Sequence, residues 1–494
     1  MKDHSLFKLL ASFSKEEIKD FGDFISVPYF NKRKAVKQLF EAVKKFYPDF
    51  NKLNHKTFNI EKIFSKIFPG KEYNEGTIRV LLHYLNDLAK KFITIKSFEN
   101  NEYEFNLIQQ SELFSRHQVT NINKVIDKSL SELSLKNILS EQFYFQKYKL
   151  EYEKMYYLSE SHMGVYEKLL DNFDFQKMYF DFNIYYNLNT MRLYLNILNI
   201  EIIYNKKFGK KLFEKIISNI EIKDYNDIPV MKAYYYLIKI ITSKNNEEYY
   251  FKIKEIVKEI KNKIHIDDLT EIYINMKNFC KRRIADGKEY YLNEEFKIII
   301  DEIETKTYLK GGGEMGPVFY RNTVNSALKL KKYDWVKDFI DNFKNELPEN
   351  IRNYSYLYSS ALYSFKMKEY EKSLEYLSKV KFDEVYQKVE AKILQMMIFY
   401  EMNSDETLLS SLEAFRHFIN GNKIIPGKRK LPYIGFYKTL NKVISIKFKK
   451  DKYQIREFKN QLLAENTISN KEWLMEKTDE LLINLSSGKN MKQA

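Results

Sequence analysis

The sequence has 494 residues, a formal net charge of +15 and an apolar content of 44%, including 39 Tyr and 37 Phe, which excludes an intrinsically disordered chain. Only 14 Gly and 8 Pro are present, too few turn residues for an all-β protein, so the composition predicts long helices. A lone cysteine and the lack of any uncharged apolar run of about 18 residues exclude a disulfide framework and a membrane-spanning helix, and predict a cytoplasmic protein without a signal peptide.

Residues 1–100 are predicted to form a small helical module. Ser14 and Glu17 have the spacing of a capping box, which opens an amphipathic helix. We expect that helix to end near Val27, because Pro28 disfavours helical geometry in the residue before it.

Asn31 is expected to cap the next helix, which Pro48 closes. The apolar stripe of this helix consists of Val36, Leu39, Phe40 and Val43. Two more helices are predicted on either side of the turn at Pro69-Gly70.

The helices around Pro69-Gly70 permit two interpretations. In a helix-turn-helix motif, Arg79, His83 and Lys90 would face nucleic acid. The connector is longer than the usual tight turn, and the same face carries Glu75 and Asp87. A structural helical hairpin is therefore the favoured interpretation.

Residues 101–310 are predicted to form a succession of helices with dense aromatic residues. Such residues could stack on single-stranded bases, but stacking requires a cationic groove and this block is close to neutral. We therefore expect the aromatic side chains to pack in the core between helices.

The segment KGGGEMGPVF carries Gly311, Gly312, Gly313 and Gly316 and is predicted to be a loop or hinge between two helical blocks. It contains the spacing G-x-G-x-x-G of a dinucleotide-binding turn. That turn requires a preceding β-strand, whereas the preceding NEEFKIIIDEIETKTYLK favours a helix. A phosphate-binding role is therefore disfavoured.

Internal repetition follows this segment. Aligning Tyr333 with Tyr370 gives a period of 37 residues, and in each unit one helix ends before the tyrosine and a second follows it. Residues 317–420 thus resemble tetratricopeptide (TPR) repeats, with Pro348 where a TPR unit ends in proline. The resemblance implies an α-solenoid of stacked hairpins, each covering the apolar face that its neighbour leaves exposed.

The segments PYFNKRK, PGKEYN, DWVKDFIDNFKNELPENIR and AFRHFINGNKIIP together resemble a broad family of uncharacterised all-helical bacterial proteins. This resemblance spans most of the chain. It implies the architecture and a bacterial origin, and it brings no known activity.

The positive charge lies at the two ends of the chain. Residues 1–100 hold 19 Lys and Arg against 12 Asp and Glu, and residues 421–494 hold 16 against 7. Within the C-terminal part, GNKIIPGKRKLPY is predicted to be a basic loop, followed by a helix pair. Either these ends bind an acidic partner or nucleic acid, or the charge reflects a solvated surface and an AT-rich genome. The residues of the candidate contact surfaces are Lys428, Arg429, Lys430, Lys447, Lys449, Lys450 and Lys452 at the C-terminal end, and Lys32, Arg33, Lys34 and Arg79 at the N-terminal end.

No pattern of catalytic or metal-ligating residues is apparent in the sequence, so we predict neither enzymatic activity nor a cofactor. His265 with Asp267 and Asp268 is the most compact group, and it suits a helix cap. Basic neighbours could activate Cys280, but without a histidine partner a buried cysteine is expected. The preferred hypothesis is a non-catalytic scaffold that binds a protein or peptide, and the alternative is a nucleic-acid-associated regulator that uses the basic ends.

Overall fold

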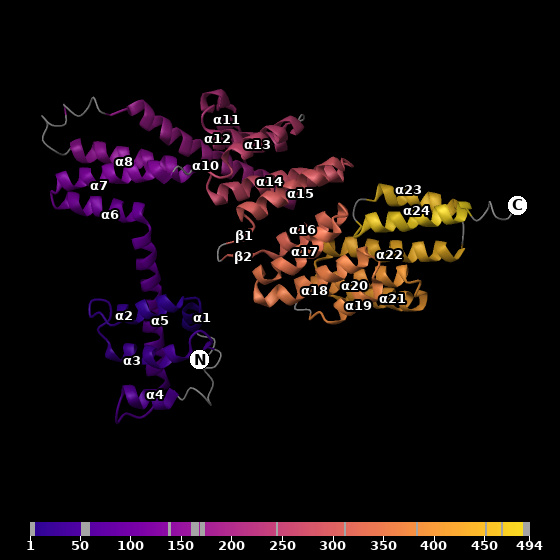
Figure 1. Ribbon diagram of the computed structural model, residues 1–494, viewed down its shortest axis with the longest axis horizontal. Coiled ribbons are helices and arrows are strands. Elements are labelled where there is room, and N and C mark those ends of the chain that lie inside the picture. The colour runs from indigo at the N-terminus through magenta and orange to yellow at the C-terminus, as the bar shows by residue number, and fades with distance from the viewer. Residues whose placement is uncertain are drawn as a thin grey trace. The chain divides into compact units, whose positions relative to one another are not determined.

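The computed structural model describes residues 5–50, 60–136, 140–159, 167, 173–243, 246–310, 313–381, 384–449, 452–465 and 468–487. These residues are almost entirely helical (Figure 1), which confirms the all-α prediction. They divide into two compact units, residues 1–189 and residues 190–494. The division falls inside the block predicted for residues 101–310.

The first unit consists of short helices followed by longer ones. Its elements are α1 (Ser5–Ala11), α2 (Lys15–Phe24), α3 (Lys34–Val43), the 3₁₀ helix η1 (Lys44–Phe46), α4 (Ile60–Ile67), α5 (Glu75–Asn100), α6 (Glu102–Ser115), α7 (Val119–Lys136) and α8 (Glu141–Ser159). Helix α10 (Phe175–Tyr204) contributes its residues up to Asn189 to this unit and the rest to the second.

Helices α1 to α4 gather around the first half of α5 (Figure 1) and share one apolar core with it. Phe21 and Phe40 meet edge to face at the centre of that core, with ring centroids 5.0 Å apart. The capping box is confirmed, because the Ser14 hydroxyl accepts the N–H of Glu17 at 3.0 Å and the Glu17 carboxylate accepts the N–H of Ser14 at 2.8 Å.

The prediction that Asn31 caps a helix was wrong. Helix α2 already ends at Phe24 and α3 begins only at Lys34. Asn31 instead closes the loop between them, where its side chain donates to the carbonyl of Ile25 at 2.9 Å and accepts the N–H of Arg33 at 2.9 Å. An asparagine side chain can accept a backbone N–H either at the start of a helix or within a turn, and Asn31 does so within a turn.

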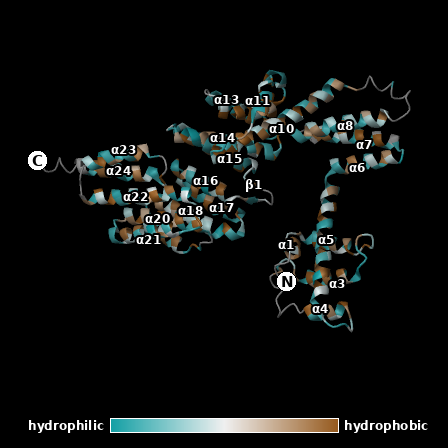
Figure 2. Ribbon diagram, turned by 180° about the vertical axis from the view of Figure 1, so that it is seen from behind, coloured by the Kyte–Doolittle hydropathy of each residue, from teal (hydrophilic) through white to brown (hydrophobic). Residues whose placement is uncertain are grey.

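The second unit consists of helical hairpins. After the end of α10 its elements are α11 (Lys211–Ser218), the 3₁₀ helix η4 (Ile222–Tyr225), α12 (Pro229–Thr242), α13 (Asn246–Ile260), α14 (Ile266–Ala285), α15 (Tyr290–Thr305), β1 (Leu309–Lys310), β2 (Glu314–Met315), α16 (Pro317–Lys329), α17 (Tyr333–Phe343), the 3₁₀ helix η5 (Lys344–Glu346), α18 (Glu349–Lys366), α19 (Tyr370–Ser378), α20 (Val385–Glu401), α21 (Asp405–Gly421), α22 (Gly427–Lys449), α23 (Lys452–Ala464) and α24 (Lys471–Ser487). Figure 2 shows that apolar and polar residues alternate along most of these helices, as expected for elements that bury one face.

The same turn closes three successive hairpins, α16–α17, α18–α19 and α20–α21. It places Lys331, Lys368 and Asn403 in the left-handed region, with φ of 57°, 63° and 54°. In each turn the following N–H bonds back to the carbonyl five residues earlier, at 2.8–3.0 Å, which is the Schellman arrangement. Tyr333 and Tyr370, which the sequence alignment pairs, each begin the second helix of a hairpin. The stacking of these hairpins as a TPR-like solenoid stays a prediction.

The glycine-rich segment between α15 and α16 is a small β-hairpin where a loop or hinge was expected. Strands β1 and β2 pair antiparallel, with Leu309 opposite Met315. Gly313 adopts a φ of 78°, a backbone conformation that residues with a side chain rarely adopt. Gly316 occupies the N-cap position of α16. Gly311 and Gly312 lie outside the described residues.

The C-terminal helices continue the core of the repeats. A single apolar cluster runs from Tyr358 in α18 to Leu474 in α24. The prediction of a basic loop over GNKIIPGKRKLPY was wrong in its second half, because α22 begins at Gly427 and includes Pro432. The carbonyl of Pro426 accepts the N–H groups of Arg429 and Lys430, so Pro426 lies at the start of α22 and does not interrupt it.

Candidate functional site

The N-terminal module contains an open pocket of about 570 Å³ where the starts of α3 and α5 meet the end of α4. Its apolar wall is formed by Ala35, Phe68, Val80 and Leu81. Its polar rim is formed by Arg33, Lys34, Asn74, Gly76 and Thr77. We call it the N-terminal pocket. Its volume and mostly apolar wall are those of sites that hold a small molecule or a few peptide side chains.

Two helices start at the N-terminal pocket, and the uncapped start of α3 adds positive charge to it. Arg33 occupies the cap position of α3 and gives no side-chain cap, so the first N–H groups of that helix keep their partial positive charge. Asn74 caps α5 by accepting the N–H of Thr77 at 2.9 Å. The cationic side chains of Arg33 and Lys34 add to this field at the rim.

Arg33 is held in place by Tyr84, one helical turn beyond Val80 on α5. Its guanidinium carbon lies 3.6 Å from the centroid of the tyrosine ring, and its Nη2 donates to the Tyr84 hydroxyl at 2.8 Å. Such a contact orients the guanidinium without neutralising its charge. Arg33 is therefore a pre-positioned cation beside an apolar wall.

Two of the four N-terminal residues predicted as contacts line this pocket, namely Arg33 and Lys34. Lys32 is exposed in the preceding loop. Arg79 lies outside the pocket and pairs with Glu75 at 2.8 Å. His83 and Lys90 each contact Asp87 on the same helix, so that carboxylate offsets part of the positive charge on this face.

The apolar wall was missed in the sequence. Val80 and Tyr84 are exposed by 50% and 36%, on a face of α5 away from its buried stripe. An exposed apolar pair spaced by four on a helix was the signal available for this face. Phe68 joins them only through the fold, because it comes from the end of α4.

The predicted C-terminal basic residues whose side chains the structure describes differ in their contacts. Lys428 and Arg429 are exposed in the first turn of α22. Lys430 donates to the carbonyl of Asn420 at 3.3 Å, and Lys447 is tied to Asp405 at 3.1 Å. Lys449 and Lys452 are helical, but the structure does not describe their side chains, and Lys450 lies outside the described residues.

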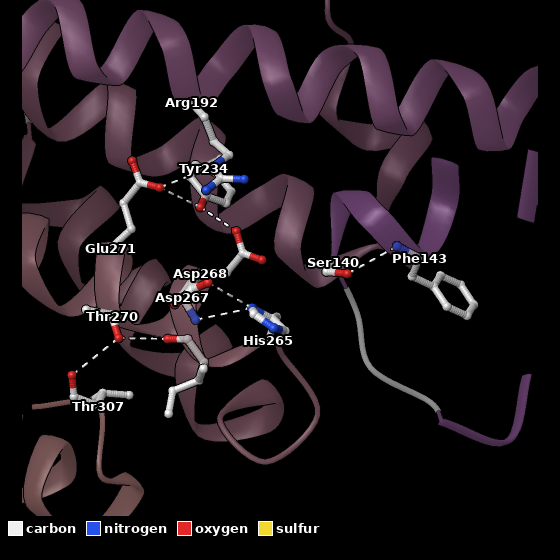
Figure 3. A network of polar contacts seen from close by, with 11 residues as sticks. Ser140, Phe143, Arg192, Tyr234, His265, Asp267, Asp268, Thr270, Glu271 and Thr307 are labelled. Atoms are coloured by element: carbon white, nitrogen blue, oxygen red, sulfur yellow. Dashed lines mark hydrogen bonds and ion pairs between the residues drawn. The ribbon is translucent and has the colours of Figure 1, made fainter. Parts of the chain in front are cut away.

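A buried polar network in the second unit joins three helices, α10, α12 and α14. Figure 3 shows Tyr234 of α12 between two carboxylates of α14, and its hydroxyl lies 2.6 Å from Asp268 and 3.0 Å from Glu271. Arg192 of α10 donates to the same Glu271 oxygen at 3.3 Å. Burial raises the pKa of Tyr234 well above its usual value, so the hydroxyl stays protonated and joins the helices.

The same view shows His265 at the start of α14 (Figure 3). Its Nδ1 accepts the N–H of Asp267 at 3.3 Å, which confirms the predicted helix cap. This contact gives the histidine of the compact group a structural role at the start of α14.

Buried glutamates on α15 form a second set of internal ion pairs. Glu302 pairs with Lys277 of α14, and Glu294 with Lys254 of α13 and with Lys297. Cys280 lies nearby and is fully buried, and burial raises the pKa of its thiol to about 12. The expectation of a buried cysteine is confirmed, and the basic residues beside it do not activate it.

Among the residues that the structure describes, no three histidine, cysteine or carboxylate side chains gather closely enough to hold a metal ion. Within the same ranges no helix combines the length and the apolar character needed to cross a membrane. Comparisons with protein-family models, with curated proteins and with solved structures found no match for this chain.

Proposed function

We propose that this protein is a non-catalytic interaction protein whose N-terminal pocket binds an acidic, amphipathic segment of a protein partner. The observation that carries the proposal is the pairing of an apolar wall, Val80 with Phe68, and a pre-positioned cation, Arg33, at one open pocket. An apolar anchor of the partner would enter the pocket, and a neighbouring carboxylate would meet Arg33 and Lys34.

The helical hairpins of the second unit support this class of function. Arrays of hairpins expose extended surfaces of side chains to a protein or peptide, and they require no reactive group. The scaffold hypothesis also includes binding of a protein or peptide to the hairpins of the second unit.

Nucleic-acid binding is the weaker alternative. It depends on free cations, yet Arg79, Lys430 and Lys447 already contact groups of this chain. The exposed pair Lys428 and Arg429 is what favours it. Binding to generic DNA or RNA that falls steeply with salt, and that is lost on reversing these two charges, would support the alternative.

Selection from a displayed library of random peptides tests the proposal. The full chain should enrich peptides that combine Asp or Glu with Leu, Ile or Phe. The variant Val80→Asp should lose them, because it places a like charge in the apolar wall. The matched control is Ile108→Asp on α6, since Ile108 is exposed by 53% and Val80 by 50%, and Ile108 does not line the pocket. Failure to enrich such peptides, or equal binding by both variants, would count against the proposal.

A further inference from the structure

The end of α10 and the start of α11 expose large apolar side chains in the second unit. Ile203, Tyr204 and Leu212 are exposed by 68%, 64% and 68%. Ile202 and Phe208 are exposed by 50% and 47%. We call these five residues the apolar tip. Single exposed apolar residues are ordinary, but five within eleven positions concentrate exposed apolar side chains in one short segment.

The apolar tip is held outward by the fold. Glu201 accepts the N–H of Phe208 at 3.0 Å and the Lys210 ammonium at 2.6 Å, so the loop after α10 folds back on the helix end. The rings of Tyr194 and Phe213 stack 6.1 Å apart and join α10 to α11. The exposed side chains are thus presented by anchored backbone.

Four exposed lysines lie within or next to the apolar tip in the sequence. Lys206, Lys207, Lys211 and Lys215 are all exposed, while Glu214 is the exposed carboxylate among them. The partner surface must therefore be anionic and must also accept aliphatic and aromatic side chains. A second copy of the chain would bring like charges together, and a phosphate backbone would leave Ile203 and Leu212 exposed to water.

An anionic lipid surface meets both requirements. Large apolar side chains enter the boundary between headgroups and acyl chains, and lysines approach the headgroup phosphates. It also requires no preformed groove in the protein, which suits eight consecutive exposed residues, 202–209. We propose that residues 200–215 form a peripheral contact with an anionic lipid surface, through the apolar tip and its four lysines.

Vesicle co-sedimentation of the full chain tests this contact. The protein should pellet with vesicles of phosphatidylcholine and phosphatidylserine, and should stay in solution with phosphatidylcholine alone. The variant Lys206→Glu/Lys207→Glu should lower the partition coefficient at least about tenfold, and high salt should weaken binding. The variant Ile203→Ser/Leu212→Ser should also lose binding, while circular dichroism shows unchanged helix content.

Two controls match these changes. Lys428→Glu/Arg429→Glu reverses two exposed charges elsewhere in the same unit, and Val318→Ser removes an apolar side chain exposed by 59%. Both should bind anionic vesicles as the native chain does. No sedimentation with anionic vesicles, or equal losses in the controls and the tip variants, would overturn the proposal. Binding by the tip to an acidic protein but not to vesicles would also overturn it.

Discussion

Lys477 of α24 and Glu401 of α20 form a buried ion pair, with the Lys477 Nζ 2.8 Å from the Glu401 Oε1. The same oxygen accepts the indole N–H of Trp473 at 2.8 Å. Burial alone would lower the pKa of Lys477, but hydrogen bonds to Glu401 and Glu480 outweigh it and raise that pKa. The pair therefore joins helix α24 to helix α20 of the hairpin α20–α21.

Removing one partner of this pair should destabilise the second unit. Lys477→Met removes the ammonium that neutralises the Glu401 carboxylate and should cost about 3 kcal/mol of unfolding free energy. Urea unfolding followed by circular dichroism measures it. Lys379→Met removes a lysine from an exposed pair with Glu375 and should leave the unfolding curve almost unchanged. Equal shifts in both variants would show that the buried pair has no special weight.

The left-handed turn residues predict a stabilising substitution. Lys368 has a φ of 63°, which disfavours any residue with a Cβ. Lys368→Gly relieves this cost but enlarges the conformational freedom of the unfolded chain, so a net gain of about 0.5 to 1 kcal/mol is expected. Lys388→Gly, inside α20, should instead cost about 1 kcal/mol. Thermal unfolding of the two variants should therefore shift in opposite directions, and a loss of stability in Lys368→Gly would refute the explanation.

Much of the helical architecture could be predicted from the sequence where the local signal was complete. The capping box at Ser14 depends on residues close together in the chain. So do the two hairpins whose second helices begin at Tyr333 and Tyr370. Predictions were wrong where one residue type suits two structures. Asn31 closes a turn instead of capping a helix. Pro432 lies inside helix α22 instead of in a loop. Asn31 bonds to residues two and six positions away, so a turn and a helix cap were equally compatible with the local sequence. Pro432 has a distant partner, because its carbonyl accepts the N–H of Ser469.

The candidate site was predictable only in part. Arg33 and Lys34 were singled out by charge, but charge did not reveal that Tyr84 orients Arg33. The apolar wall required the fold, because Phe68 and Val80 are brought together from two helices. The sequence therefore predicted a basic contact, whereas the structure offers one that is both basic and apolar.

Two glutamates on α15 predict opposite dependences of stability on pH. Burial raises the pKa of Glu294, but hydrogen bonds from Lys254 and Lys297 outweigh it and hold that pKa below 4.5. Its stabilising contribution is therefore present above the unfolded pKa and is lost as the pH falls through the folded value. Burial raises the pKa of Glu302 above 4.5, so its contribution is greatest at acid pH and declines as the pH rises through the folded value.

Urea unfolding between about pH 3 and about pH 7 checks this pair, with Glu294→Gln and Glu302→Gln as variants. The difference between the native chain and Glu294→Gln should shrink toward acid pH. The difference between the native chain and Glu302→Gln should change in the opposite sense. Parallel profiles for the two variants would contradict the assigned directions.

Cys280 should be inert in the folded protein. Its side chain is fully buried and burial raises the pKa of its thiol to about 12, so little thiolate forms near neutral pH. Labelling with iodoacetamide should be negligible under native conditions and complete in urea. Rapid labelling of the native chain would show that the thiol is accessible.

Binding of an acidic, apolar peptide at the N-terminal pocket can be measured by titration. A fluorescent acidic and apolar peptide, obtained from the library selection, is titrated with the full chain and followed by anisotropy. Arg33→Glu/Lys34→Glu should weaken binding at least about tenfold, and exchanging the acidic residues of the peptide for lysine should restore it. Equal affinity of the peptide for the native chain and for this charge-reversed variant would show that Arg33 and Lys34 do not bind it.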